Sequence, residues 1–136
     1  METKLLSNST ADLQEAAHLL KEGNVVGIPT ETVYGLAADA RNPEAVRQIF
    51  AAKGRPADNP LIVHIAKLEE LESVAVSVPE LALKLAEKFW PGPLTMILPK
   101  HPSIPVITSG GLDTVGVRMP SHPVARKLIE LSGVPI

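Results

Sequence analysis

The sequence predicts an α/β fold, in which helices pack against a layered β-sheet. Strand and helix patterns alternate along the 136 residues, which is typical of layered α/β domains. Hydrophobic residues make up 45% of the chain and charged residues 21%, which is close to globular averages and excludes general disorder. No linker, repeat or low-complexity segment divides the sequence, so we expect residues 1–136 to form a single domain.

Helices are predicted where apolar residues recur at helical spacing between a polar start and a glycine or aromatic stop. Pro43 suits the first position of a helix, because its fixed φ is helical and the amide hydrogen that it lacks would have no partner there. The predicted helices run from Ser9 or Thr10 to about Glu22, from Pro43 to Gly54, from a capping box at Ser77 and Glu80 to Phe89, and from Ser121 to Gly133.

Short apolar runs predict the strands, which are expected at residues 24–29, 60–66, 94–98 and 114–119. Successive side chains of a strand point to opposite faces of the sheet. His64 should therefore point away from Val63, and Thr114 and Arg118 should point away from Val117. The strands at residues 60–66 and 114–119 then each have one apolar face for the core and one face with polar groups.

Residues 134–136 resemble the beginning of a further strand. An apolar strand at the end of a domain would leave its edge unpaired, which is unfavourable. We therefore expect the domain to be truncated after Ile136 and incomplete at its C-terminus.

The composition excludes several classes of protein. Cysteine is absent, which excludes disulfides, thiolate metal sites and a cysteine nucleophile, and the four histidines form no local metal-binding pair. The net charge of −2 argues against a simple binder of nucleic acid or of a membrane surface. No apolar run approaches the ~18–20 residues of a membrane span, and no signal peptide is evident. We expect a cytoplasmic protein with no membrane partner.

Polar residues at the ends of predicted elements are the candidates for chemistry. PTETVYGL, residues 29–36, directly follows a strand, where ligands of α/β sheets bind, but it could equally form a polar turn. Lys53 and Arg55 could clamp a phosphate or could simply stabilise the end of a helix. Residues 109–113 carry two glycines, which form either an anion-binding nest or a plain turn.

Two strand residues are further candidates. His64 is either a ligand-binding group or a histidine that the core satisfies. Arg118 stands beside Gly116, which leaves room for a carboxylate or phosphate ligand, although an ion pair with a protein carboxylate is as good an explanation. Together these groups suit a small anionic ligand that carries a hydroxyl.

The order of four segments resembles the YrdC-like family. These segments are PTETVYGL, IFAAKGRPADNPLIVHI, FWPGPLTMIL and GLDTVGVRMPSHPVARKLI, and the resemblance extends from about residue 10 to the last residue. It implies a three-layer, twisted, mixed β-sheet flanked by helices around a positively charged cavity. It also implies a nucleotidyltransferase activity, which makes L-threonylcarbamoyladenylate from L-threonine, bicarbonate and ATP and releases pyrophosphate. A separate threonylcarbamoyl-transferase complex would then modify tRNA.

The resemblance also implies roles for individual residues. Thr32 and His64 would contact L-threonine, and Arg118 would pair with its carboxylate. On the side of the nucleotide, Lys53 and Arg55 would hold the phosphates of ATP and carry the catalytic role, with Mg²⁺ accompanying ATP and no metal held by protein groups alone. Asn59 and Thr114 would contact the nucleotide.

The sequence departs from the family in one respect. In the family, the segment corresponding to GVPI continues into a Ser-x-Asn segment that completes the nucleotide pocket, whereas here the sequence ends at Ile136. We therefore expect weak or no synthase activity from these residues alone. The alternative is a non-catalytic module of the same fold that binds tRNA or double-stranded RNA, which the acidity and the scarcity of aromatics disfavour. A third interpretation is the carbamoyl-transfer domain of a hydrogenase-maturation protein, which has a related fold. That class normally comes with zinc-finger and acylphosphatase segments, which are absent from this sequence.

Overall fold

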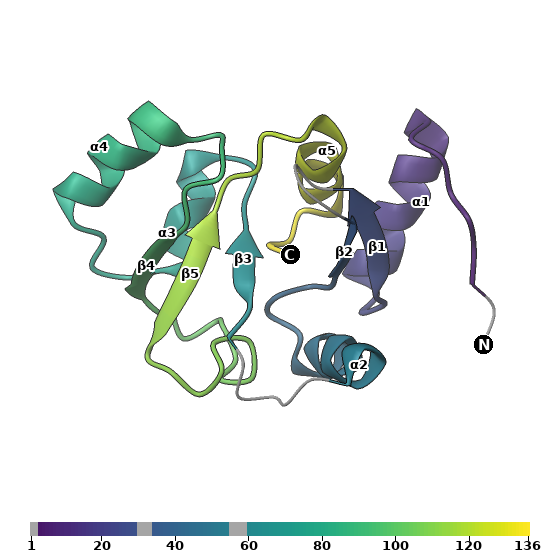
Figure 1. Cartoon of the computed structure of the whole chain (residues 1–136), viewed down its shortest axis with the longest axis horizontal. Coiled ribbons are helices and arrows are strands. Elements are labelled where there is room, and N and C mark those ends of the chain that lie inside the picture. The colour runs from purple at the N-terminus through teal and green to yellow at the C-terminus, as the bar shows by residue number, and fades with distance from the viewer. Residues whose placement is uncertain (1–2, 30–33, 55–59) are drawn as a thin grey trace.

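The computed structural model describes residues 3–29, 34–54 and 60–136, and it confirms the α/β class (Figure 1). In the described ranges, no helix is long and apolar enough to cross a membrane. The elements in chain order are α1 Thr10–Lys21, β1 Val26–Pro29, β2 Tyr34–Ala37, α2 Pro43–Lys53, β3 Ile62–His64, the 3-10 helix η1 Leu68–Glu70, α3 Leu71–Val74, α4 Glu80–Phe89, β4 Met96–Pro99, β5 Thr114–Arg118 and α5 Pro123–Ser132.

The described strands form two sheets rather than one. β1 and β2 make an antiparallel pair, and the other sheet has the order β3-β5-β4. The second sheet is mixed, as expected, because β3 is parallel to β5 and β4 is antiparallel to it. β2, which overlaps the end of the segment considered as a polar turn, was not among the predicted strands, nor were η1 and α3 among the predicted helices.

The C-terminal residues lie along the outer edge of β3. The amide of His64 donates to the carbonyl of Ile136 over 2.7 Å, and the amide of Ile136 donates back to His64 over 3.2 Å. Residues 134–136 are not assigned as a strand, yet Ile136 makes the reciprocal pair of bonds typical of one. β3 is therefore held between β5 and Ile136.

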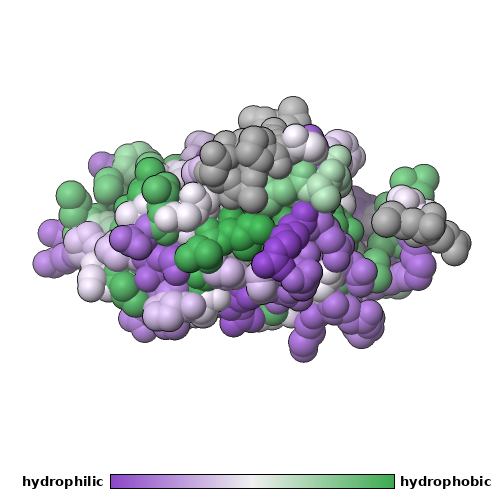
Figure 2. All heavy atoms as spheres, turned by 90° about the horizontal axis from the view of Figure 1, so that it is seen from below, coloured by the Kyte–Doolittle hydropathy of each residue, from purple (hydrophilic) through white to green (hydrophobic). Residues whose placement is uncertain are grey.

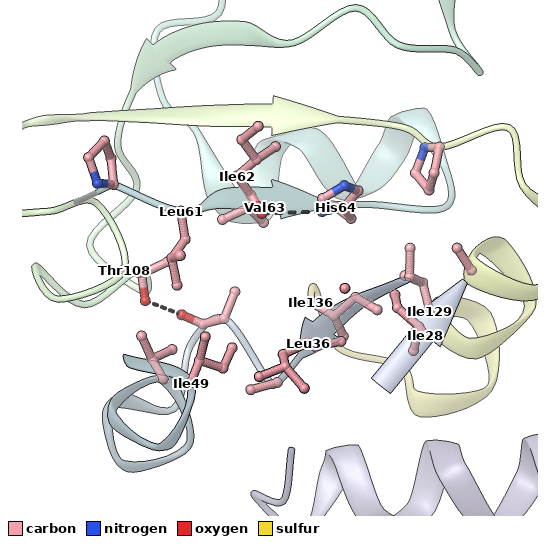
Figure 3. Close-up of a pocket in the computed structure, with 18 residues that line it drawn as sticks. Ile28, Leu36, Ile49, Leu61, Ile62, Val63, His64, Thr108, Ile129 and Ile136 are labelled. Carbon is pink, nitrogen blue, oxygen red and sulfur yellow. Dashed lines mark hydrogen bonds between the residues drawn. The ribbon is translucent and has the colours of Figure 1, made fainter. Parts of the chain in front are cut away.

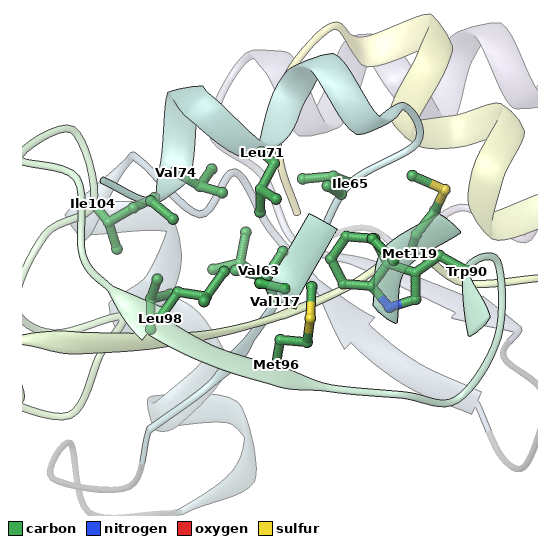
Figure 4. Packing of buried hydrophobic residues seen from close by; sticks show 14 of the residues in the cluster. Val63, Ile65, Leu71, Val74, Trp90, Met96, Leu98, Ile104, Val117 and Met119 are labelled. Atoms are coloured by element: carbon green, nitrogen blue, oxygen red, sulfur yellow. The ribbon is translucent and has the colours of Figure 1, made fainter. Parts of the chain in front are cut away.

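The main apolar cluster covers one face of the mixed sheet (Figure 4). Val63 and Val117 are fully buried there, beneath Leu71 and Val74 of α3. His64 and Arg118 belong to the other face and are only partly buried. The alternation predicted for β3 and β5 is thereby confirmed, and the polar face of these strands carries His64 and Arg118.

A second cluster joins the two ends of the chain. α1 packs against α5, and both lie beside β1 (Figure 1). Leu20 and Leu128 are almost completely buried in this cluster, with Ile136 at its margin toward β3. Burial of each such side chain contributes roughly 1.5–3 kcal/mol to folding, so this cluster fixes the C-terminal residues against the sheet edge.

Two predicted helix starts are confirmed. The hydroxyl of Ser9 accepts from the amide of Asp12 and caps α1. Asn42 caps α2 ahead of Pro43, and Gly54 closes that helix in the left-handed region at φ 66°, which favours glycine. These caps define where α2 ends and hence where Lys53 lies.

Two other predicted starts are wrong. Ser77 has a positive φ of 51°, and α4 instead begins after Pro79, which has an extended backbone and no side-chain capping bond. At α5 the cap is His122 rather than Ser121, because Pro123 takes the first helical position and the Nδ1 atom of His122 accepts from the amide of Val124.

Replacing Asn42 by alanine should lower the free energy of unfolding by about 1 kcal/mol, the usual loss for an N-cap. The Oδ1 atom of Asn42 accepts from the amides of Glu44 and Ala45 at 3.1 and 3.3 Å, and alanine cannot replace it. Urea unfolding of Asn42→Ala would measure the loss. Asn8→Ala, at an exposed position, is the matched control and should be nearly neutral. An equal loss in both variants would show that the cap is not the cause.

Candidate functional site

A cavity of about 270 Å³ lies between β2, α2, β3 and α5 (Figure 3). Ile136 closes one side, beside His64. The volume is slightly below the usual range for small-molecule sites, so the cavity suits a ligand no larger than an amino acid. Its described lining consists of Ile28, Gly35, Leu36, Ala37, Ala38, Ala40, Val46, Ile49, Pro60, Leu61, Ile62, Val63, His64, Thr108, Pro120, Ala125, Ile129 and Ile136.

The described lining of this cavity contains neither lysine nor arginine, which differs from the positively charged cavity that the family resemblance implies. The reason is local, because α2 turns Val46 and Ile49 toward the cavity. Figure 2 shows hydrophobic atoms gathered at the centre of one face of the molecule, with hydrophilic atoms around them. Polar chemistry in the cavity comes from two described side chains, His64 and Thr108.

His64 is held in a defined orientation. Its backbone is bonded to Ile136 on one side of β3, and β5 pairs with the other side. Its Nδ1 atom lies 3.2 Å from the carbonyl oxygen of Ile62. A carbonyl only accepts, so this contact favours the tautomer with the proton on Nδ1 and makes Nε2 the acceptor of the neutral ring. Thr108 is also fixed, because its buried hydroxyl donates to Ala40 over 2.8 Å.

Arg118 lies directly beside His64. The two residues are paired across the parallel strands β3 and β5, whose chains run about 4.8 Å apart, and both point to the same face. The Nε and Nη2 groups of Arg118 donate to the hydroxyl of Thr95 over 2.9 and 2.6 Å. Within the described residues, the other three N–H groups of the guanidinium make no hydrogen bond and can bind a ligand.

Thr114 is on the same face of β5 but at its other end. It lies four residues before Arg118, which is about 13 Å along a strand. Between them, Gly116 leaves the face open: a Cβ atom there would be 3.3 Å from Thr95 Cγ2 and 3.9 Å from Ile62 Cγ1. The strand thus offers two separate polar positions on one face.

Lys53 is the last residue of α2 and is exposed. It is not part of the described cavity lining, although α2 forms one wall of that cavity. A cation at this position also interacts favourably with the helix dipole. Thr32, Arg55 and Asn59 lie outside the described residues, so the structure places neither the PTET segment nor the rest of the Lys53 loop.

Two further motifs have structural roles. The glycine pair forms a turn, because the amides of Gly110 and Gly111 donate to Ile107 and Val106 rather than forming an open nest. Trp90 is buried, and its Nε1 atom donates to the carbonyl of Leu94 over 2.8 Å. It serves as a packing residue rather than as a platform for stacking bases.

The described residues form no group of three or more His, Cys, Asp or Glu side chains that could hold a metal ion.

Sequence reasoning missed Thr95, Thr108 and Ile136 as members of the site. Their neighbours at the site, Arg118, Ala40 and His64, are 23, 68 and 72 residues away in the sequence, so no local pattern relates them. The apolar run at residues 94–98 did predict a strand around Thr95, but a threonine in a strand is ordinary.

These features define an α/β domain in which an imidazole and a guanidinium stand side by side next to a small apolar cavity. The family model Sua5_yciO_yrdC, with the description "Telomere recombination", matches residues 18–136. The chain belongs to this family.

Similar proteins carry a common name. The chain is 60% identical over 121 residues to threonylcarbamoyl-AMP synthase of Pyrococcus abyssi and 53% identical over 136 residues to that of Bacillus subtilis. These alignments cover 89% and 98% of the chain but only 36% and 39% of the relatives. The crystal structure of P. abyssi Sua5 complexed with L-threonine superposes with a TM-score of 0.90 at 55% identity, covering 97% of this chain and 38% of that one.

Proposed function

We propose that this chain is the L-threonine-binding part of a threonylcarbamoyl-AMP synthase. The observation that carries the proposal is the pair of His64 and Arg118, fixed side by side on adjacent strands next to a cavity of amino-acid size. The similarity to a structure that contains L-threonine supports it. The chain spans less than two fifths of that relative, so the complete reaction is part of the proposal as well.

The roles proposed for the L-threonine side follow from charge and hydrogen bonding. The planar guanidinium of Arg118 matches the two oxygens of a carboxylate. The Nε2 atom of His64, which accepts when Nδ1 carries the proton, suits the ammonium or hydroxyl group of the amino acid. Thr32 is the third contact, by the family pattern. The apolar lining beside His64 suits the methyl group of L-threonine.

The proposed reaction forms two bonds in sequence. The amine of L-threonine, after losing a proton, attacks the carbon of bicarbonate, and hydroxide leaves as water to give a carbamate. An oxygen of the carbamate then attacks the α-phosphorus of ATP, and the bond to the bridging oxygen breaks to release pyrophosphate. Lys53 and Arg55 neutralise the charge that develops on pyrophosphate, which is the main help that a protein can give to such a transfer.

We place the nucleotide at Thr114, the second polar residue on this face of β5. Thr114, about 13 Å along β5 from Arg118, contacts the nucleotide together with Asn59. Carbamates are unstable in water, so the two steps must occur without release between them. In the cell, the product would pass to a threonylcarbamoyl-transferase complex that modifies tRNA. A cytoplasmic location belongs to the same proposal.

Calorimetric titration with L-threonine and with L-serine tests the L-threonine side. We expect L-threonine to bind about tenfold more tightly, because one methyl group in an apolar pocket is worth roughly 1–3 kcal/mol. D-threonine is a further comparison, because it has the same composition but cannot place carboxylate, amine and side chain together in the same contacts. Equal affinities for all three compounds, or no detectable binding of L-threonine, would contradict the proposal.

The nucleotide side is tested by titration with Mg-ATP. Lys53→Ala should weaken the binding of Mg-ATP but leave the affinity for L-threonine unchanged, because Lys53 lies outside the described lining of the cavity. Lys127→Ala, at an exposed position on α5, controls for the loss of one positive charge. If Lys53→Ala and Lys127→Ala had the same affinity for Mg-ATP, Lys53 would not be one of the phosphate-binding groups.

A further inference from the structure

We propose that Thr95 is a positioning residue, which sets the direction of the Arg118 guanidinium before the ligand binds. This inference rests on the proposed function, in which Arg118 receives the carboxylate of L-threonine. The role differs from a direct contact with the substrate, because Thr95 acts through another side chain.

The first argument is the shape of the contact. One hydroxyl oxygen accepts from two different groups of the guanidinium, Nε over 2.9 Å and Nη2 over 2.6 Å. Two bonds from one planar group to one atom hold the group in place and direct its far edge away from that atom. The remaining edge of the guanidinium then presents parallel N–H groups away from Thr95, which is the geometry that a carboxylate requires.

The second argument is how Thr95 itself is held. The Cγ2 methyl of Thr95 lies over Gly116, where a Cβ atom would approach it to 3.3 Å. Gly116 is not among the glycines with positive φ, so its backbone does not require glycine. Its lack of a side chain instead provides the space for the methyl group. A β-branched residue has few χ1 rotamers, so a methyl fixed over Gly116 also fixes the hydroxyl toward Arg118.

The third argument is energetic. A free arginine side chain has many rotamers, and ordering it at the moment of binding reduces affinity. Thr95 orders the guanidinium in the absence of a ligand. The free protein has therefore already lost this side-chain entropy, and binding does not reduce it further. Arg118 is only partly buried, so packing restrains its side chain less than it restrains a core residue.

Two substitutions separate the hydroxyl from the methyl. Thr95→Val keeps the shape and removes the acceptor, whereas Thr95→Ser keeps the acceptor and removes the methyl. We expect Thr95→Val to weaken L-threonine binding by roughly tenfold, the usual value of a hydrogen bond to a charged group, and Thr95→Ser to restore most of the affinity. Equal affinities of Thr95→Val and the wild-type chain would overturn the proposal.

The ordering of Arg118 can be measured without any ligand. The Nε–H signal of Arg118, identified in a ¹⁵N NMR spectrum by its loss in Arg118→Lys, should exchange slowly with water in the wild-type chain and in Thr95→Ser. In Thr95→Val it should exchange rapidly, although the protein remains folded. Slow exchange in Thr95→Val, or rapid exchange in the wild type, would overturn the proposal. Absence of L-threonine binding by a wild-type chain with slow exchange would instead contradict the proposed function alone.

The space over Gly116 provides an independent test. Gly116→Ala should weaken L-threonine binding in the wild-type background, because the new Cβ displaces the Thr95 methyl. In the Thr95→Ser background the same change should have little effect, since serine has no Cγ2. This coupling is what a double-mutant cycle measures. Equal effects of Gly116→Ala in both backgrounds would show that the methyl does not hold Thr95 in place.

Discussion

Arg118→Ala is expected to weaken the binding of L-threonine by roughly 30-fold or more. Truncating one partner of a buried, hydrogen-bonded charge pair costs about 2–5 kcal/mol, and each 1.4 kcal/mol is a factor of ten in affinity. Arg118 is partly buried, so we expect a loss near the lower end of this range. Much of this loss would come from the carboxylate of the ligand, which would lie beside His64 without a counter-charge. Isothermal titration calorimetry would measure the change.

Arg118→Lys separates charge from shape. Lysine keeps the positive charge, but it cannot donate two parallel N–H groups to a carboxylate, so we expect it to recover only part of the affinity. Arg47→Ala removes an exposed arginine that pairs with Glu44 on α2, and it should leave the affinity unchanged. Binding by Arg118→Ala as tight as that of Arg47→Ala would exclude Arg118 from the carboxylate site.

The alternation of residue types was sufficient to predict the two faces of β3 and β5. Val63 and Val117 are buried, while His64 and Arg118 lie on the opposite face, as period-two patterning requires. Their adjacency was not predictable from this pattern. It depends on the parallel register between β3 and β5, which is set by packing between segments more than fifty residues apart.

Local signals were less reliable where tertiary structure competes with them. The Ser77 and Glu80 pair has the sequence of a capping box, yet the positive φ of Ser77 turns the chain away before α4 begins. β2 was missed because it contains Gly35 and follows two threonines, a composition that is also typical of a turn. Only its antiparallel pairing with β1, Ile28 opposite Gly35, makes that segment a strand.

The chemical character of the cavity was also beyond the sequence pattern. The family resemblance implied a positively charged cavity, but Lys53 and Arg118 lie outside the described lining, to which α2 and β2 contribute apolar side chains. The positive charge of Arg118 thus lies next to the apolar cavity and not within its described lining. Such an arrangement lets a ligand bury its apolar part next to His64 while its anionic part stays at the guanidinium.

The stability of the site depends on the apolar side chains beneath it, and Ile65→Ala tests this dependence. Ile65 is completely buried beside Leu71 and Val117 (Figure 4), and its amide donates to the carbonyl of Arg118 over 3.0 Å. Truncation removes apolar contacts and leaves a cavity that the surrounding core fills only in part. We expect the free energy of unfolding to fall by about 2–5 kcal/mol, measured by urea denaturation.

Ile97→Ala is the matched control, because it makes the same chemical change on a neighbouring strand of the same sheet. Ile97 is 73% exposed on the edge strand β4, so its truncation removes little buried surface and should cost under about 0.5 kcal/mol. The slope of the free energy of unfolding against urea concentration should be the same in both variants if each substitution changes only the stability. A loss for Ile97→Ala as large as that for Ile65→Ala would mean that β4 is covered in solution. Retention of slow Nε–H exchange at Arg118 in folded Ile65→Ala would show that Thr95, and not core packing, orders the guanidinium.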